Sequence, residues 1–525
     1  MSNRRKLPIG VQDFEKLRSG NNVYVDKTSY IYQLVTTDAP YFLSRPRRFG
    51  KSLFLSTLKA YFLGKKELFH GLALAKLERE WLNYPVFYLD LNKAAYQNEQ
   101  TLNDVLDELL KQYETEWEVT NIAARLSLRF DNLIRTASKK TGRKVVVLID
   151  EYDKPLVNTL DNTEVNQSMR NILKGFYGVL KSADAYLRFV FLTGVTKFSK
   201  VSVFSDLNHL KDISLNRHYA GICGITEKEL IHYFEPEIQL LSEQVHLSYD
   251  ETLAKLRKHY NGYRFCEDIE TMYNPFSLLN TFDAGNFHNY WYATGTPTFL
   301  AKMLKENDFD IPDLENNVHV SVADITDYKI GANNPIPILY QSGYLTIRDY
   351  HTEFEDELIL GFPNEEVKYG FLRELLPVYA PQYTIHQKFS AVSFLSTLRA
   401  GNIHGFMETL RAFYSSIPYD LMKKETKNER YYQFVFYLLV TLMGQFVQTE
   451  VKHALGRADA VIKMSDTIFV FEFKMANHGT VEEALAQIDS KEYLIPYKVD
   501  GRKLVKIGAV FSEKERTLDR WKIEQ

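Results

Sequence analysis

The sequence predicts an α/β protein in which two sheet-containing regions are separated by a mainly helical middle. Three patterns lead to this prediction. Short apolar runs alternate with helix-spaced apolar residues as far as residue 220, as in a three-layer domain built on a parallel sheet. Residues 222–324 then show mainly helical spacing. Two apolar segments, 458–463 and 467–474, flank a short turn and predict a β-hairpin in a C-terminal α/β domain.

The length and charge of the chain limit its organisation. A chain of 525 residues has room for about three to four domains. We place their boundaries at 1–221, 222–324, 325–400 and 401–525. The net charge of −3 excludes an overall basic surface, so a nucleic-acid site would have to be a local basic groove.

The cysteine content and the apolar runs bear on the compartment. The two cysteines, Cys223 and Cys266, are far apart in sequence, which is typical of a reducing environment and predicts a cytoplasmic protein. Residues 1–6 are not followed by an apolar segment, so we expect no secretion signal. The longest apolar run, Phe434–Val447, is shorter than the ~20 residues that span a bilayer, so we expect no membrane association.

A phosphate-binding loop is predicted between a strand and a helix near the N-terminus. The apolar run Tyr41–Leu43 enters a loop that closes on Gly50-Lys51-Ser52, and apolar residues at helical spacing follow. The first N–H groups of a helix point at an anion, so this context favours a nucleotide. Lys51 would reach the β- and γ-phosphates, and the Ser52 hydroxyl would contribute to a magnesium site. The predicted cofactors are therefore ATP and Mg²⁺.

The loop departs from the usual G-x-x-x-x-G-K-[ST] pattern because Arg45 replaces the first glycine. The turn must then differ, and the neighbouring arginines add positive charge beside the phosphates. A chance match within a basic loop is the alternative. The predicted nucleotide-binding residues of this loop are Arg47, Arg48, Phe49, Gly50, Lys51, Ser52 and Leu53.

A second strand supplies the acidic residues of the predicted nucleotide site. The five apolar residues Val145–Ile149 are typical of a strand buried on both faces, and Asp150 and Glu151 follow at its carboxyl end. Asp150 would hold Mg²⁺ through water, and Glu151 would orient and deprotonate the attacking water. The alternative is a solvated acidic turn that includes Asp153, which the upstream Gly-Lys-Ser disfavours.

A third strand, 187–194, places Thr193 at its end, where a hydroxyl could sense the γ-phosphate. A hydroxyl that merely ends a strand before a glycine is the alternative. Arg170, Arg188 and Lys197 are candidates for a charge-stabilising finger, and the sequence selects none of them.

The region 337–364 has the outline of a winged-helix module, a helix and a hairpin followed by a further helix. The predicted wing is acidic at Glu353, Glu355, Asp356 and Glu357. Acidic side chains repel phosphates, so we expect a role other than DNA contact for this module.

The C-terminal hairpin carries a second set of candidate residues. Because side chains alternate along a strand, Glu472 and Lys474 share one face while three phenylalanines line the other. If Ser465-Asp466 form a two-residue turn, Asp459 lies directly opposite Glu472, with Cβ atoms about 4.5–5.5 Å apart. Two carboxylates this close repel one another unless a cation lies between them.

This arrangement predicts a magnesium ion held by Asp459 and Glu472, with Lys474 positioning or activating the attacking water. The expected reaction is in-line displacement at a phosphodiester. Further along, Gln487 and Tyr493 fall in a helix pattern over 482–493 and could contact the substrate or the water. Simple polarity on a helix surface competes with that interpretation. The alternative for the acids is a loop aspartate beside a glutamate–lysine ladder on an edge strand.

The two constellations, in this order, resemble a bacterial family with an AAA-ATPase-like N-terminal domain and a PD-(D/E)XK nuclease-like C-terminal domain. The N-terminal similarity rests on LPIGVQDF, VDKT, RPRRFGKSL, VLIDEYD and LTGVTKFS. The C-terminal similarity rests on GRADAVI, FEFK and the pair Gln487 and Tyr493, which resembles the RecB-like branch. The resemblance implies a P-loop three-layer ATPase followed by a restriction-endonuclease-like domain, with Asp459, Glu472 and Lys474 as the catalytic set.

Three functions remain open at this point. The first is an ATP-controlled, Mg²⁺-dependent nuclease whose expected substrate is DNA. The second is a nucleotide-dependent switch or assembly ATPase whose C-terminal domain binds nucleic acid without cleaving it. The third is a scaffold without catalysis, which two separate metal-site patterns disfavour. The chain could also form a homo-oligomer.

Overall fold

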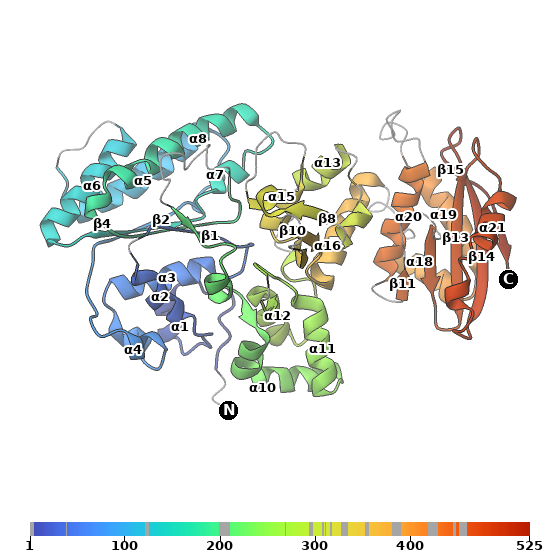
Figure 1. Cartoon of the computed structure of the whole chain (residues 1–525), viewed down its shortest axis with the longest axis horizontal. Coiled ribbons are helices and arrows are strands. Elements are labelled where there is room, and N and C mark those ends of the chain that lie inside the picture. Colours follow the sequence, from blue (N-terminus) through green and yellow to red (C-terminus); the bar gives the residue numbers. More distant parts are fainter. Residues whose placement is uncertain are drawn as a thin grey trace. The chain divides into compact units, whose positions relative to one another are not determined.

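The computed structural model describes the chain apart from a set of short gaps, and Figure 1 shows the course of the described parts. The described residues are 5–37, 39–120, 125–198, 210–267, 269–292, 298–306, 309, 311–315, 318–326, 334–351, 356–380, 390–417, 429–444, 448–450 and 459–525. The chain forms two compact units, residues 1–295 with 316–367, and residues 296–315 with 368–525. We describe each unit by itself.

The first unit is built on a five-stranded parallel sheet with the strand order β2-β3-β4-β1-β5. Its central strands β3 and β4 are mainly apolar and almost entirely buried, as expected for a sheet covered on both faces. The strand β4 lies between β1, which leads into the phosphate loop, and β3, which ends in the acids. The strands are β1 (Tyr41–Ser44), β2 (Val86–Asp90), β3 (Val145–Asp150), β4 (Leu187–Gly194) and β5 (Lys211–Asp212).

Helices cover both faces of this sheet and make a three-layer domain, as Figure 1 shows. One layer contains α1 (Phe14–Ser19), α2 (Thr28–Val35), α3 (Lys51–Phe62) and α4 (Leu74–Leu77). The other contains α5 (Glu99–Glu116), α6 (Leu126–Thr141), α7 (Lys154–Val157), α8 (Thr163–Tyr177) and α9 (Val179–Ser182). The predicted three-layer α/β fold of the N-terminal region is confirmed.

The middle region within the first unit is mainly helical, as predicted. Two of its helices begin with reciprocal capping boxes, in which a hydroxyl and a glutamate bind each other's backbone N–H groups. Its elements are β6 (Ile225–Thr226), α10 (Glu227–Val245), α11 (Tyr249–Tyr260), β7 (Met272–Tyr273) and α12 (Pro275–Ala284).

A small antiparallel sheet with the order β8-β10-β9 follows in the same unit. The predicted helix and hairpin are present here, although the wing residues 352–355 lie outside the described residues. The elements are β8 (Val318–Ser321), α14 (Val322–Thr326), α15 (Ile336–Gln341), β9 (Thr346–His351) and β10 (Glu357–Gly361). Helix α16 (Glu365–Tyr379) begins in the first unit and continues in the second.

The second unit contains a five-stranded mixed sheet with the order β11-β12-β13-β14-β15. Only β13 and β14 run parallel, because α21 connects them across one face. The strands are β11 (Gln448–Glu450), β12 (Ala460–Lys463), β13 (Thr467–Met475), β14 (Lys503–Ser512) and β15 (Thr517–Glu524). The helices include α13 (Thr298–Glu306), α18 (Ala391–Arg399), α19 (Ile403–Ser415), α20 (Glu429–Met443) and α21 (Val481–Ser490).

The two faces of β13 have different partners. Phe471 and Phe473 pack on Phe436 of α20, with ring centroids 5.1 and 4.8 Å away. Val470 on the opposite face packs in a cluster with residues of α21. The predicted division of β13 into a phenylalanine face and a mixed face is therefore confirmed.

In the described part of the chain, no helix is long and apolar enough to cross a membrane.

Candidate functional sites

The phosphate loop has the backbone that an anion-binding helix start requires. Gly50 caps α3 with a φ of 96°, in the left-handed region that glycine adopts without strain. Lys51 opens the helix, and its side chain is 3% exposed. Its ammonium donates to the carbonyls of Arg45 and Pro46, at 3.0 and 3.3 Å, and lies 3.4 Å from a Glu151 oxygen. The loop therefore already surrounds the cation that we expect to bind phosphates.

The arginine that replaces the first glycine faces the protein interior. The Arg45 side chain is 1% exposed, and its guanidinium donates to backbone carbonyls that include that of Ser214, at 2.7 Å. The guanidinium also stacks on the Phe265 ring, 4.0 Å from its centroid. Burial lowers the pKa of Arg45. The arginine thus fixes the altered turn by binding carbonyls from inside the fold.

Residues of the middle region contact the rest of the loop. The Trp291 indole donates to the Arg47 carbonyl at 3.0 Å. The exposed Arg48 lies over the Phe276 ring, at 4.9 Å, and Phe49 packs edge-on against Tyr263, with ring centroids 4.7 Å apart. The sequence-predicted residues 47–49 are thus held by the segment 263–291, and no motif indicated that contact.

Asp150 and Thr193 meet at the carboxyl ends of β3 and β4. Asp150 is 3% exposed and accepts hydrogen bonds from the Thr193 hydroxyl at 2.6 Å and the Tyr88 hydroxyl at 3.1 Å. Burial and the neighbouring Glu151 raise the pKa of Asp150, and hydrogen bonds from Thr193 and Ser52 act in the opposite direction. Glu151 itself has a φ of 52°, an uncommon conformation for a residue with a side chain. The predicted residues therefore converge on one edge of the sheet.

A mainly apolar pocket opens beside Gly50 and Leu53. Lys27 contributes the main charge and is paired with Glu229 at 2.6 Å. Tyr24, Phe49 and Ile225 are among the apolar residues that line it. A planar base next to the helix start would find an apolar wall here.

The hairpin near the C-terminus has the predicted register. Val461 pairs with Val470 and Lys463 with Ile468, and the pairing ends at Ala460 with Phe471, directly before Asp459 and Glu472. Glu472 is 2% exposed, and its Oε2 atom has no hydrogen-bond partner among the residues that the structure describes. Burial and the nearby Asp459 raise the pKa of Glu472 to about 7. Its other oxygen, Oε1, accepts from the Gln487 amide and lies 3.4 Å from the Lys474 ammonium, so the charge of this buried acid is only partly offset.

Asp459 and Lys474 are both held in place. Asp459 accepts the Phe473 backbone N–H at 2.7 Å and the Gln433 amide at 3.3 Å. The Lys474 ammonium donates to the Gln487 carbonyl oxygen at 2.7 Å and lies 3.4 Å from Glu472. Sequence reasoning missed Gln433, a polar residue directly before the apolar run of helix α20, and that position was the available signal.

Gln487 joins the members of this set. Its amide nitrogen donates to Glu472 and lies 3.4 Å from the Tyr493 hydroxyl. The sequence pattern predicted that Tyr493 lies within this helix. Helix α21 ends at Ser490, however, so Tyr493 lies just beyond it. The structure thus brings together all five residues expected at this site.

Comparisons with known proteins agree with the two constellations. A family model described as "Predicted AAA-ATPase" matches residues 8–204, and a model of the PD-(D/E)XK nuclease superfamily matches residues 427–521. The "Uncharacterized protein in vnfD 5'region" of Azotobacter chroococcum mcd 1 is 36% identical over 519 residues, which cover 98% of both chains. The chain belongs to the same family as this Azotobacter protein.

The family matches contain the candidate residues. The AAA-ATPase-like domain runs from before β1 to beyond the end of β4 and includes the phosphate loop, Asp150 and Thr193. The PD-(D/E)XK domain includes Asp459, Glu472 and the residues of α21. The combination of an AAA-ATPase-like domain with a domain of the nuclease superfamily is therefore shown.

The C-terminal residues fit a magnesium ion. Among the residues that the structure describes, no group of three or more His, Cys, Asp or Glu side chains is arranged for metal binding. Mg²⁺ needs fewer protein ligands, since it takes one or two carboxylates and completes its shell with water and phosphate oxygens. Asp459 with the unpartnered Oε2 of Glu472 matches that requirement.

Proposed function

We propose that the chain is an ATPase coupled to a Mg²⁺-dependent nuclease that cleaves phosphodiesters of nucleic acid, with DNA as the expected substrate. One observation carries the nuclease half. Glu472 is buried opposite Asp459, with one oxygen unpartnered and its pKa raised to about 7. A divalent cation would remove that cost, and the same cation would neutralise phosphate oxygens.

In the C-terminal site, Asp459 and Glu472 would hold Mg²⁺, which supplies positive charge to the phosphate when bound. Lys474 would donate a hydrogen bond to the attacking water, because its ammonium lies beside Glu472. Gln487 and Tyr493 would orient these groups or contact the nucleic-acid backbone. The water oxygen would form a bond to phosphorus, and the bond from phosphorus to the leaving sugar oxygen, on the opposite side, would break.

In the N-terminal site, Lys51 would leave the carbonyls of its loop and bind the β- and γ-phosphates of ATP. Ser52 and Asp150 would hold the nucleotide's Mg²⁺. Glu151 would accept the proton of the attacking water, and Thr193 would lie near the γ-phosphate through its contact with Asp150. Residues 47–53 would form the rest of the nucleotide contact.

The deciding experiment measures cleavage of linear and circular DNA by the full chain with Mg²⁺, in the presence and absence of ATP. We expect cleavage that is lost in Glu472→Ala and in Lys474→Ala. Cleavage that survives both substitutions would come from a contaminant and would overturn the nuclease half. Phosphate release from ATP, with and without DNA ends, tests the ATPase half.

A second candidate is a nucleotide-dependent switch that assembles and binds nucleic acid without cleaving it. The contacts of Trp291 and Tyr263 with the phosphate loop favour it, since they link nucleotide binding to the middle region. ATP-dependent formation of homo-oligomers without any nicking of DNA would support this candidate over the first.

A further inference from the structure

The segment that follows β4 is packed tightly against the acidic turn after β3. Thr193 donates to Asp150, and the next residue, Gly194, has no room for a side chain. A Cβ atom at Gly194 would lie 2.6 Å from Oδ1 of Asp153 and from ring atoms of Tyr152. Any movement of Asp150 or Glu151 must therefore be accommodated by this segment, residues 193–197, which we call the β4 extension.

Hydrogen bonds fix the β4 extension to the same turn. The Asp153 carboxylate accepts the N–H groups of Val195, at 3.1 Å, and Thr196, at 2.5 Å. The Tyr152 hydroxyl donates to the Thr196 carbonyl at 2.9 Å. Asp153 is 1% exposed, and burial followed by the charge of Glu151 raises its pKa to about 7. These hydrogen bonds thus hold the β4 extension against the acidic turn.

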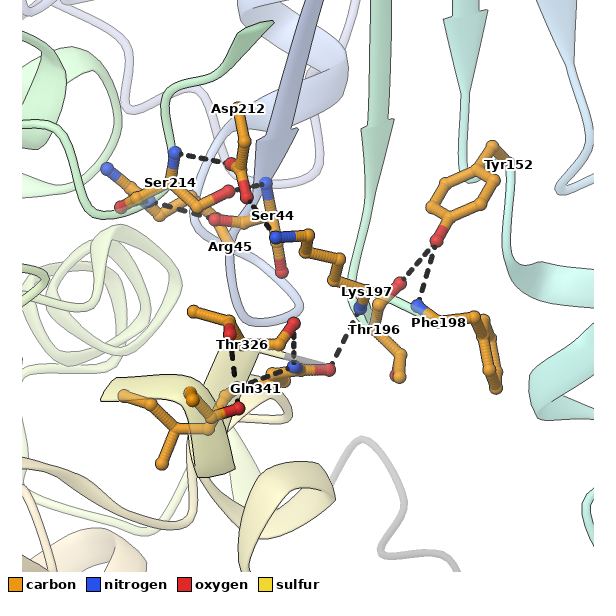
Figure 2. A network of polar contacts seen from close by, with 12 residues as sticks. Ser44, Arg45, Tyr152, Thr196, Lys197, Phe198, Asp212, Ser214, Thr326 and Gln341 are labelled. Atoms are coloured by element: carbon orange, nitrogen blue, oxygen red, sulfur yellow. Dashed lines mark hydrogen bonds and ion pairs between the residues drawn. The ribbon is translucent and has the colours of Figure 1, made fainter. Parts of the chain in front are cut away.

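One side chain of the middle region holds the far end of this extension, as Figure 2 shows. The Oε1 atom of Gln341, at the end of α15, accepts the Lys197 N–H at 2.8 Å. Its Nε2 atom donates to the carbonyls of Ile325, at 2.8 Å, and Thr326, at 3.3 Å, at the end of α14. Gln341 is 6% exposed, so these bonds do not compete with bulk water.

Further contacts connect the β4 extension to the phosphate loop and to β5. Lys197 forms an ion pair with Asp212 at 2.7 Å, and the Arg45 N–H donates to the Gly194 carbonyl at 3.2 Å (Figure 2 shows the ion pair). All of these groups lie within the first compact unit. The Lys197 backbone is thus positioned by the acidic turn, the loop and Gln341 together.

We propose that Gln341 is a positioning residue for ATP hydrolysis that also transmits the nucleotide state to α14. The proposal rests on the proposed ATPase function and names how the middle region is linked to it. A neutral amide suits this position, because it offers an acceptor to the Lys197 N–H and a donor to two carbonyls at once. Displacement of Thr193 or Glu151 by a bound nucleotide moves the β4 extension, and Gln341 carries that movement to residues 322–326.

Kinetics of the full chain test the positioning role. Gln341→Leu removes both sets of hydrogen bonds, whereas Gln341→Glu keeps the acceptor for Lys197 and loses the donor to the two carbonyls. We expect Gln341→Leu to lower kcat for ATP about tenfold while KM changes less than about twofold. Gln239→Leu, on the exposed face of α10, is the matched control and should leave both constants unchanged. An unchanged kcat, or a rise in KM alone, overturns the positioning role.

Hydrogen exchange tests the transmission, and its first measurement uses the wild-type chain, so it does not depend on the folding of a variant. Adding ATP and Mg²⁺ should change the exchange rates of amides at 195–197 and at 322–326. In Gln341→Glu the change should persist at 195–197 and disappear at 322–326. A wild type that binds ATP without any change at 322–326 overturns this proposal alone. A wild type that binds no ATP overturns the proposed function, and this proposal with it.

Discussion

The two candidate sites differ in the contacts that their buried charged side chains make. In the N-terminal site, the Lys51 ammonium is already surrounded by two loop carbonyls and a Glu151 oxygen. In the C-terminal site, the Oε2 atom of the buried Glu472 has no hydrogen-bond partner in the described part of the chain. If the proposed function holds, a nucleotide at the first site would have to replace existing contacts and would move the loop. The second site would need only an added cation.

Under the proposed function, the first site would change conformation when it binds its ligand, and the second would hold its reacting groups in place. The phosphate loop is contacted from the middle region through Trp291, so replacing the contacts of Lys51 has consequences beyond the nucleotide. The C-terminal acids lie at a β-hairpin, and their immediate partners, Gln433 and Gln487, come from helices of the same unit. Four predictions test the comparison, beginning with the largest expected effect.

The first prediction concerns the unpartnered acid. Glu472→Gln keeps the shape of the side chain and removes its charge, so Mg²⁺ binding in the absence of nucleotide should be lost. DNA cleavage should fall by about three orders of magnitude, since the charge on the phosphate is no longer neutralised. Titration calorimetry measures the binding, and gel analysis measures the cleavage.

The matched control for this prediction is Asp466→Asn, at the exposed turn of the same hairpin. It removes an acid without touching the pair and should leave both measurements unchanged. Equal Mg²⁺ binding by Glu472→Gln and by the wild type would place the metal elsewhere and remove the contrast between the two sites.

The second prediction separates nucleotide binding from hydrolysis at the first site. Lys51→Ala should abolish ATP binding, because it removes the cation that would contact the phosphates. Glu151→Gln should keep binding and lower hydrolysis by about 10²- to 10³-fold, since the amide cannot accept the proton of water. Fluorescent-nucleotide binding and phosphate release distinguish the two variants. Lys66→Ala, an exposed lysine beyond α3, should behave as the wild type. Weak binding by Glu151→Gln would assign that residue to binding instead.

Sequence reasoning was most successful where local geometry leaves one solution. The two-residue turn and the alternation of side chains determine the register of the hairpin, which is why the pairing of Val461 with Val470 could be predicted. The same holds for the helix start at Lys51 and for Thr193 at the end of β4. The roles of these residues stay predictions that the experiments above address.

The remaining contacts join residues that no sequence period relates. Gln341 binds Lys197 across 144 residues, and Trp291 binds Arg47 across 244. Their partners are backbone groups, which carry no sequence signal. In the second unit, Phe406 of α19 packs on Phe471 of the sheet, with ring centroids 6.1 Å apart. Packing between distant segments decides these features, and a single sequence does not encode them locally.

The third prediction tests how the C-terminal set is held. Gln487→Ala removes the amide that contacts both Glu472 and Lys474, so the ammonium should lose its orientation. Cleavage should fall about tenfold, while Mg²⁺ binding weakens less than in Glu472→Gln. Glu482→Ala, exposed on the same helix, is the control. A loss as large as that of Glu472→Gln would mean that Gln487 takes part directly in the chemistry.

The last prediction uses Glu366, a buried acid outside both sites whose burial also raises its pKa to about 7. Both of its oxygens have partners, because the Ser277 hydroxyl and the Trp291 N–H each donate at 2.7 Å. A carboxyl whose pKa is higher in the folded chain than in the unfolded chain binds its proton more tightly in the folded chain. Protonation of this group therefore stabilises the fold. The free energy of unfolding should therefore decline as the pH rises from 4.5 to about 7, and stay level above that.

Glu366→Gln should remove this slope and make the chain more stable than the wild type at pH 8, by roughly 3 kcal/mol at most. Urea unfolding at pH 5 and pH 8 measures the difference. If an unpartnered oxygen, rather than a raised pKa, marks a metal site, then Mg²⁺ should stabilise the wild type and Glu366→Gln equally. A Mg²⁺ effect that disappears in Glu366→Gln would show that a buried acid alone attracts the cation, and the contrast between the partnered and unpartnered acids would fail.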